Sequence, residues 1–207
     1  MKPRFITFEG IDGAGKSVRI ELLANRLKNN SIPNLVTREP GGTDLGESIR
    51  KVLLDSSCTI SSLTELLLMF ASRVQHVSEV IGNALCDDMW VICDRFYDAT
   101  YAYQGWGRGL SIDTINSLHE LCTNSIEPDL TFLIDISVQE SIDRTQKRNS
   151  KQDKFDYLDS DFKERVRQGY IDRANSDPDR IKVINGDQSV ELVHEAIWKT
   201  IYKFYIQ

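Results

Sequence analysis

The stretch Gly10-Ile11-Asp12-Gly13-Ala14-Gly15-Lys16-Ser17 decides the fold of this 207-residue chain. It satisfies the pattern GxxxxGK[ST] and lies between a short apolar run and a segment of helical period. In that context the pattern is typical of a phosphate-binding loop, because glycines let backbone N–H groups close around phosphate oxygens at a helix N-terminus. Lys16 adds a positive charge, and the Ser17 hydroxyl is suited to bind Mg²⁺. We therefore expect the whole stretch to hold the phosphates of a nucleotide such as ATP.

Short apolar runs alternate with longer segments of helical period along the rest of the chain. The predicted strands are 5–8, 34–37, 89–93, 130–134 and 181–184. The predicted helices follow the phosphate loop and then cover 62–85, 111–124, 138–148, 160–175 and the C-terminal segment. This alternation predicts an α/β three-layer sandwich, with a five-stranded parallel sheet flanked by helices.

Composition limits the classes of partner. The chain has 25 basic and 31 acidic residues, a net charge of −6, which argues against a surface that binds nucleic acid. No run approaches the roughly 18 apolar residues of a membrane span, and Met1–Arg4 leads directly into a strand without a signal peptide. We expect a cytoplasmic protein with one domain over 1–207, because no linker or internal repeat divides the chain.

A phosphate loop alone is shared by GTPases, ATP-driven machines and small-molecule kinases. The chain lacks the Asn-Lys-x-Asp tetrad that reads guanine, and its length disfavours a large ATPase. A kinase with a phosphorylated acceptor needs a second cationic site that faces the loop. The arginines that could build it are Arg38, Arg50, Arg73 and Arg95. Two other classes stay open at this point: a different nucleotide or deoxynucleoside kinase, and a nucleotide-dependent switch that binds a partner protein.

Four further motifs narrow the choice: TREPGGT at 37–43, MFASRVQH at 69–76, DRF at 94–96 and AYQGWGRG at 102–109. Together they resemble thymidylate kinase of the bacterial type. The resemblance implies the fold of the nucleoside monophosphate kinases and transfer of the γ-phosphoryl group of ATP to dTMP, which yields dTDP. It also implies Mg²⁺ and a homodimer, for which the long helix 62–85 is the expected contact.

The resemblance assigns roles to individual side chains on the acceptor side. Phe70 would stack on thymine, Arg73 would donate to a thymine carbonyl, and Thr100 would face the imide edge of the ring. Tyr103 and Gln104 would fill the space beside the 2′ carbon of the sugar and so reject a ribose.

The phosphate end of the acceptor would be held by charged residues. Arg95 directly follows a strand, where ligands of parallel sheets bind, and would clamp the acceptor phosphate with help from Arg38. Asp94 would hold the acceptor or magnesium-bound water, while Glu9 and Asp12 would join this network or contact the sugar hydroxyl. The expected catalytic residues are Lys16, Asp94, Arg95 and Arg148, and the expected metal ligands are Glu9, Ser17 and Asp94.

A mobile lid is predicted at about 144–158. Gly13 leaves the phosphate loop without an arginine, and the bacterial members that the chain resembles supply this charge from the lid. Arg148 is the first candidate cation, ahead of Arg144, Lys147 and Lys154. The chain reads Asp153-Lys154-Phe155-Asp156 where the resembled lid has a bidentate arginine, so lysine takes that position.

Overall fold

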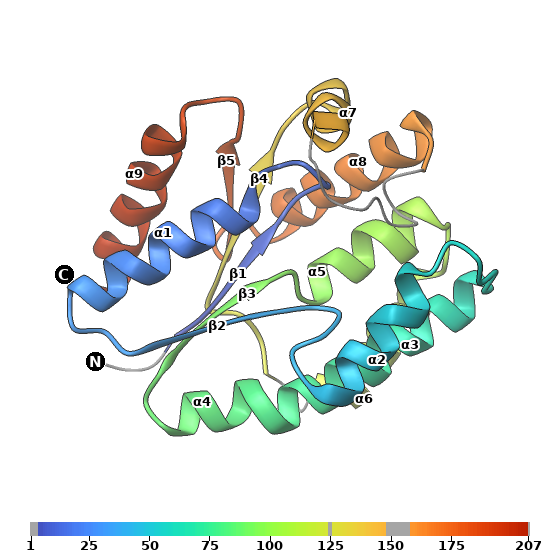
Figure 1. Ribbon diagram of the computed structural model, residues 1–207, viewed down its shortest axis with the longest axis horizontal. Helices are drawn as coiled ribbons and strands as arrows, with labels where there is room; N and C mark the ends of the chain where they lie inside the picture. The colour runs from blue at the N-terminus through green and yellow to red at the C-terminus, as the bar shows by residue number, and fades with distance from the viewer. Residues whose placement is uncertain (1–3, 124–125, 148–157, 207) are drawn as a thin grey trace.

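The computed structural model describes residues 4–123, 126–147 and 158–206 and contains one five-stranded sheet (Figure 1). All four strand pairings are parallel, in the order β2-β3-β1-β4-β5. The strands are β1 Phe5–Glu9, β2 Asn34–Arg38, β3 Trp90–Asp94, β4 Leu130–Asp135 and β5 Ile181–Asn185. The five apolar runs of the sequence are therefore the five strands, as predicted.

The helical segments fall between the strands. They are α1 Lys16–Asn29, α2 Asp44–Leu54, α3 Ser62–His76, α4 Gly82–Cys86, α5 Tyr97–Thr100, α6 Ile112–Thr123, α7 Val138–Lys147, α8 Ser160–Ser176 and α9 Val190–Ile201. Three π-helical segments extend them: η1 Val77–Ile81, η2 Tyr101–Gly107 and η3 Tyr202–Ile206.

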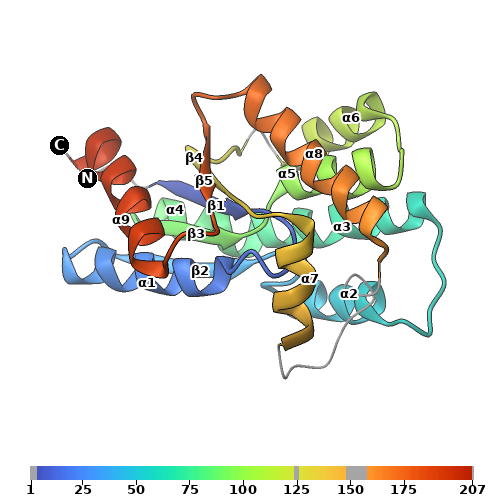
Figure 2. The ribbon, with the colours of Figure 1, turned by 90° about the horizontal axis from the view of Figure 1, so that it is seen from above.

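The helices cover both faces of the sheet (Figures 1 and 2). Because successive side chains of a strand point to opposite faces, β1 turns Ile6 and Phe8 toward α1 and Phe5 toward α3 and α4. Helices α1 and α9 pack together on the first face, and α8 packs against β4 and β5 on the other. The predicted three-layer α/β sandwich is confirmed.

Three helical segments, α2, α5 and η2, were not predicted from the sequence. Helix α2 follows the Pro- and Gly-containing turn, where the Thr43 hydroxyl accepts a hydrogen bond from the Gly46 N–H at 2.9 Å. Segment η2 carries the AYQG motif and continues α5. The long helix predicted at 62–85 is helical over its whole length, with η1 between α3 and α4.

The carboxyl ends of β1 and β3 lie next to each other. Phe8 is in register with Asp94, and the Arg95 N–H donates to the Phe8 carbonyl at 2.9 Å. The phosphate loop therefore begins beside the Asp94-Arg95 pair, at the edge of the sheet where ligands of open parallel sheets bind.

The predicted lid lies only partly within the described structure. Residues 144–147 are the end of α7, whereas Arg148 and Lys154 lie outside the described residues. None of the helices in 4–123, 126–147 and 158–206 is long and apolar enough to cross a membrane.

Candidate active site

The phosphate loop has the backbone that its glycines allow. Gly10 has φ 134°, and a Cβ there would lie 2.4 Å from the Ile134 carbonyl oxygen of β4. Lys16 begins α1 and folds back, so that Nζ donates to the Gly10 carbonyl at 3.2 Å. Burial lowers the pKa of Lys16, and the nearby Arg95 charge lowers it further. The loop thus carries a buried cation at the point where phosphates would lie.

Gly13 lies against α7. It has φ 79°, and a Cβ at this position would come within 2.8 Å of the Ser141 carbonyl oxygen. The Ser141 hydroxyl also donates to the Asp12 carbonyl at 2.6 Å. Helix α7 therefore fixes the tip of the phosphate loop and leaves no room for a side chain there.

Ser17 and Asp94 form the candidate magnesium site. The Ser17 hydroxyl lies 3.5 Å from Asp94 Oδ2. Asp94 Oδ1 is buried and has no hydrogen-bond partner among the described residues. Mg²⁺ prefers one or two oxygen ligands from the protein together with waters and substrate phosphates, so this donor set fits the ion.

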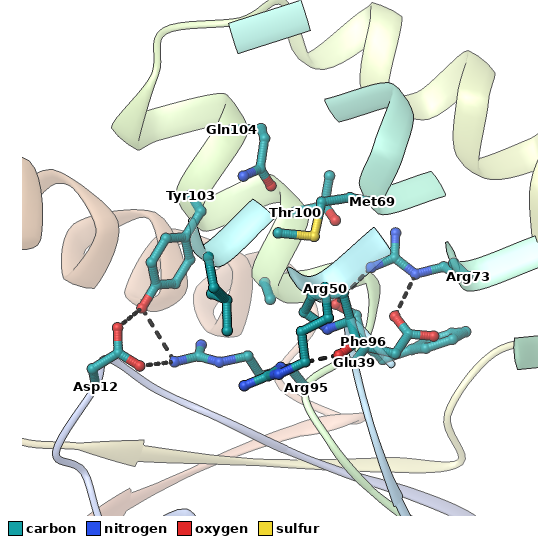
Figure 3. Close-up of a pocket in the computed structure, with 13 residues that line it drawn as sticks. Asp12, Glu39, Arg50, Met69, Arg73, Arg95, Phe96, Thr100, Tyr103 and Gln104 are labelled. Carbon is teal, nitrogen blue, oxygen red and sulfur yellow. Dashed lines mark hydrogen bonds and ion pairs between the residues drawn. The ribbon is translucent and has the colours of Figure 1, made fainter. Parts of the chain in front are cut away.

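Arg95 is the centre of a half-buried polar network (Figure 3). Its Nη1 donates to the Tyr170 hydroxyl at 2.7 Å, and its Nη2 donates to Asp12 Oδ1 at 2.8 Å and to the Tyr103 hydroxyl at 3.2 Å. The Tyr103 hydroxyl in turn donates to Asp12 Oδ2 at 2.8 Å. Arg95 also has φ 68°, a left-handed conformation that non-glycine residues seldom adopt. The network holds this arginine at the carboxyl end of β3.

The charges in this network stabilise one another. Burial alone would raise the pKa of Asp12, but Arg95, Lys16 and the Tyr103 hydrogen bond lower it to about 2. Burial alone would lower the pKa of Arg95, yet its tyrosine and aspartate partners hold it well above its ordinary value. The Asp12–Arg95 pair is therefore ionised throughout the physiological range.

Glu9 lies behind Arg95 and shares Tyr170 with it. Its Oε1 accepts from the Phe96 N–H at 2.7 Å, and its Oε2 accepts from the Tyr170 hydroxyl at 2.9 Å. Burial and the Asp98 charge raise the pKa of Glu9 to about 8. Both oxygens of this expected metal ligand thus contact the protein itself.

A cavity of about 80 Å³ opens beside Arg95. It is lined by Asp12, Glu39, Pro40, Arg50, Leu54, Met69, Arg73, Arg95, Phe96, Ala99, Thr100, Tyr103 and Gln104 (Figure 3). Four of the predicted acceptor residues, Arg73, Thr100, Tyr103 and Gln104, are therefore brought together with Asp12 and Arg95.

Arg73 is fixed at one wall of this cavity. Its Nε donates to Glu39 Oε2 at 2.7 Å, and its Nη2 donates to the Phe96 carbonyl at 3.2 Å. Its Nη1 is buried without a hydrogen-bond partner in the part of the chain that the structure describes. A buried N–H group without a partner is costly, and a carbonyl in the cavity would satisfy it.

A second hollow of about 1000 Å³ lies over the phosphate loop. Its lining includes Lys16, Ser17, Arg38, Asp94 and Arg144. It shares five residues with the smaller cavity: Asp12, Glu39, Arg50, Leu54 and Arg95. Two anionic ligands could therefore meet at this shared wall, where Arg50 and Arg95 supply positive charge.

Three predicted residues have other surroundings than expected. Phe70 is 2% exposed in the core beneath the Arg73 guanidinium, and among the described residues its neighbour Met69 lines the cavity in its place. Arg38 forms two 3.0 Å hydrogen bonds with Glu47 and leaves 54% of its side chain exposed. Arg144 donates to Glu140 at 2.6 Å. The roles that the sequence predicts for these three residues stay predictions. The same holds for Lys147, which lies at the exposed end of α7.

The sequence indicated no role for Tyr170 or Glu39, and it did not single out Arg50. Arg50 was one of four candidate arginines, but nothing in the sequence indicated that α2 lies over the cavity. Glu39 is buried between Arg73 and the His76 ring, 3.0 Å from His76 Nδ1. The TREPGGT segment is thus fixed to α3 through this carboxylate. The acidic residue in TREPGGT and the basic residues in SRVQH were the signal in the sequence for this contact.

The fold and the two joined hollows, one over the phosphate loop and one beside it, are those of a phosphate-loop kinase of the nucleoside monophosphate type. The profile of the thymidylate kinase family matches residues 8–197. The thymidylate kinase of Nitrosospira multiformis is 46% identical over 206 residues, 99% of this chain and 100% of that protein. The thymidylate kinase of Kosmotoga olearia is 48% identical over 195 residues, 94% and 93% of the two chains.

A solved structure gives the same result. The crystal structure of thymidylate kinase from Ehrlichia chaffeensis superposes with a TM-score of 0.78 at 38% identity, over 97% of this chain and 99% of that one. The chain belongs to the thymidylate kinase family. Members of this family phosphorylate dTMP to dTDP with ATP, and the chain is accordingly a dTMP kinase. The resemblance read from the four motifs is confirmed.

Proposed function

We propose that dTMP binds with its nucleoside in the 80 Å³ cavity and its phosphate at the shared wall, while the larger hollow holds the phosphates of ATP. The single observation that carries this proposal is Arg95. This half-buried arginine borders both hollows and is held in place by Asp12, Tyr103 and Tyr170. A cation there can hold the acceptor phosphate in line with the γ-phosphate of the donor.

The transfer then depends on positioning and on charge. An oxygen of the dTMP phosphate attacks the γ-phosphorus, the bond to the β-phosphate oxygen breaks, and dTDP and ADP are formed. Lys16 and the loop N–H groups stabilise the charge on the donor, and Arg95 and Arg50 stabilise it on the acceptor side. Ser17 and Asp94 would hold Mg²⁺, which neutralises the phosphate charge when bound. No strong general base is needed, because the attacking oxygen is already anionic.

The base would lie at the end of the cavity away from Asp12. The Nη1 atom of Arg73 has no other partner among the described residues and would donate to a thymine carbonyl. Thr100 is 1% exposed and lines the same end. Asp12 and Tyr103 would then lie beside the sugar, which agrees with rejection of a ribose. Stacking of thymine on Phe70 stays a prediction.

Two properties of the whole molecule are proposed with this function. The first is a homodimer formed through α3, whose side chains Leu63, Leu67 and Val74 are 42–50% exposed. The second is a cytoplasmic location, where both ATP and dTMP are present.

The test is a coupled ADP-release assay across dTMP, dUMP, dCMP, AMP and thymidine. We expect turnover with dTMP well above that with dCMP, AMP or thymidine. Lys16→Ala should reduce dTMP turnover by roughly 10²–10³-fold or more with an unchanged circular dichroism spectrum, because it removes the fixed charge on the donor phosphates. ATP consumption that is independent of any acceptor, or near-normal turnover by Lys16→Ala, would overturn the proposal.

A further inference from the structure

Met69 places a thioether sulfur in the wall of the smaller cavity. Figure 3 shows this sulfur in yellow, turned toward the other side chains that line the cavity. The Met69 side chain is partly buried, whereas its neighbour Phe70 is 2% exposed and lies in the core. The cavity wall therefore carries a sulfur atom where the base would lie in the proposed function.

A thioether differs from the other apolar side chains because a peroxide can oxidise it. A lone pair of the sulfur attacks one peroxide oxygen and the O–O bond breaks. The second oxygen leaves as hydroxide, which takes the proton of the first and becomes water. The sulfur gives two electrons to the peroxide and becomes a sulfoxide. The apolar side chain of Met69 would thereby gain an oxygen that accepts hydrogen bonds.

Arg73 offers a donor for that oxygen. Met69 and Arg73 are four residues apart on α3, so they lie on one face of the helix, and both line the cavity. Arg73 is 2% exposed, and its Nη1 is buried without a hydrogen-bond partner among the residues that the structure describes. A sulfoxide oxygen on Met69 would satisfy this N–H group, which is the group that would donate to a thymine carbonyl when dTMP is bound.

We infer that Met69 is an oxidation site of the acceptor cavity, where hydrogen peroxide converts the sulfur to a sulfoxide that competes with the base for Arg73. The inference rests on the proposed placement of dTMP. Among the described residues, Met69 borders the smaller cavity and not the hollow over the phosphate loop. Oxidation should therefore weaken the binding of dTMP and leave that of ATP unchanged. The change is reversible, because methionine sulfoxide reductases restore the thioether.

Two substitutions separate the effect of the new oxygen from the loss of the sulfur. Met69→Leu keeps an apolar side chain of similar volume and cannot form a sulfoxide. Met69→Gln carries an amide oxygen on the atom that replaces the sulfur, so it supplies a similar acceptor without peroxide. We expect the KM for dTMP of Met69→Gln to exceed that of Met69→Leu by about tenfold, the effect of one competing hydrogen bond. The KM for ATP should agree within about twofold between the two variants.

The experiment treats the unsubstituted protein and Met69→Leu with hydrogen peroxide and measures steady-state kinetics with dTMP and ATP. Mass spectrometry of the peptide that contains residue 69 detects the added oxygen. For the unsubstituted protein we expect the KM for dTMP to rise by about tenfold and the KM for ATP to change by about twofold or less. Saturating dTMP during the treatment should protect residue 69, and Met69→Leu should keep the KM that it has before treatment.

Met89 provides the matched control. It is also partly buried, and it directly precedes β3, at the end of that strand opposite to Asp94. Met89→Leu should therefore stay as sensitive to peroxide as the unsubstituted protein. The four free cysteines also react with peroxide. Dithiothreitol reverses their sulfenic acids and disulfides, whereas only methionine sulfoxide reductases A and B should restore the KM for dTMP.

The outcomes separate this inference from the proposed function. Equal peroxide sensitivity of Met69→Leu and the unsubstituted protein would overturn the inference, as would a sulfoxide at residue 69 that leaves the KM for dTMP unchanged. Equal KM values for Met69→Gln and Met69→Leu, or a residue 69 that stays unoxidised while Met89 is converted, would overturn it too. In each of these cases dTMP kinase activity would still stand. Failure of the untreated protein to use dTMP would instead overturn the proposed function, and this inference with it.

Discussion

The guanidinium of Arg95 is charged although only 15% of the side chain is exposed. Arginine has five N–H donors, and the bonds to Asp12, Tyr103 and Tyr170 use only some of them. The remaining donors are the ones that would bind the acceptor phosphate in the proposed function. Because Asp12 stays ionised, the charge of Arg95 is balanced before the ligand arrives, which lowers the cost of its burial.

Arg50 should matter more for dTMP than Arg38 does. Arg50 lines both hollows, whereas Arg38 lines the larger one and is paired with Glu47. We expect Arg50→Ala to raise the KM for dTMP by about tenfold or more, the size of a lost charge-assisted hydrogen bond, and to change the KM for ATP by about twofold or less. Steady-state kinetics on Arg50→Ala and Arg38→Ala check this ranking. A larger dTMP effect in Arg38→Ala would contradict it.

Glu9 should make the protein less stable as the pH rises. Its pKa is about 8 in the folded protein against an ordinary value of 4.5, so between these values the folded state keeps a proton that the unfolded chain has lost. The free energy of unfolding should therefore fall between about pH 5 and pH 8 and stop changing with this group above that range. The pKa of Asp12 is lowered from 3.8 to about 2, so this group lowers the free energy of unfolding only as the pH falls through that acidic range.

Thermal unfolding across this pH range tests the assignment. Glu9→Gln removes the titrating group, so its melting temperature should decline less with pH than that of the unsubstituted protein. Exposed Glu21 on α1 provides the control, since Glu21→Gln should keep the unsubstituted slope. Parallel slopes for Glu9→Gln and the unsubstituted protein would show that another group is responsible.

Helix α8 contributes to the site through Tyr170, whose hydroxyl joins Arg95 to Glu9. Tyr170→Phe should lower kcat/KM for dTMP by about tenfold, because Arg95 loses a partner that directs it toward the cavity. The control is Tyr101→Phe, which removes a hydroxyl that donates to Asn116 Oδ1 at 2.5 Å on α6. Both variants should lose a similar amount of stability, and only Tyr170→Phe should lose activity. Equal activities would remove α8 from the site.

The elements differ in how far the sequence predicts them. All five strands were predictable, because each is a short apolar run with a clear boundary. Helix α2 was not predicted, although Leu45, Ile49 and Leu53 have helical spacing, because the segment directly follows a turn that contains a proline and two glycines. Segment η2 contains two glycines and lies in a motif that has no helical period. The candidate site divides in the same way: the phosphate loop and Asp94-Arg95 follow from strand ends, whereas Arg50 and Tyr170 depend on how distant helices pack.

The homodimer proposal can be tested on the outer face of α3. Burial of Leu67 against a second copy would be favourable, and a charge at this position would be costly there. We expect Leu67→Glu to sediment as a monomer of about 24 kDa, in line with the 23.6 kDa chain. Leu192→Glu, at an exposed apolar residue of α9, should stay dimeric. A Leu67→Glu protein that still sediments at twice the chain mass would contradict the proposed contact.

The close packing of Gly13 against Ser141 restricts how this enzyme can change over generations. A chain that gained an arginine at position 13 would place the new side chain where the α7 backbone already lies. Such a substitution would have to follow an earlier one that moves α7, and that intermediate would lose the hydrogen bond from Ser141 to the loop. A mutational path from this loop to one that carries its own arginine therefore passes through a weakened enzyme, which helps to preserve the glycine.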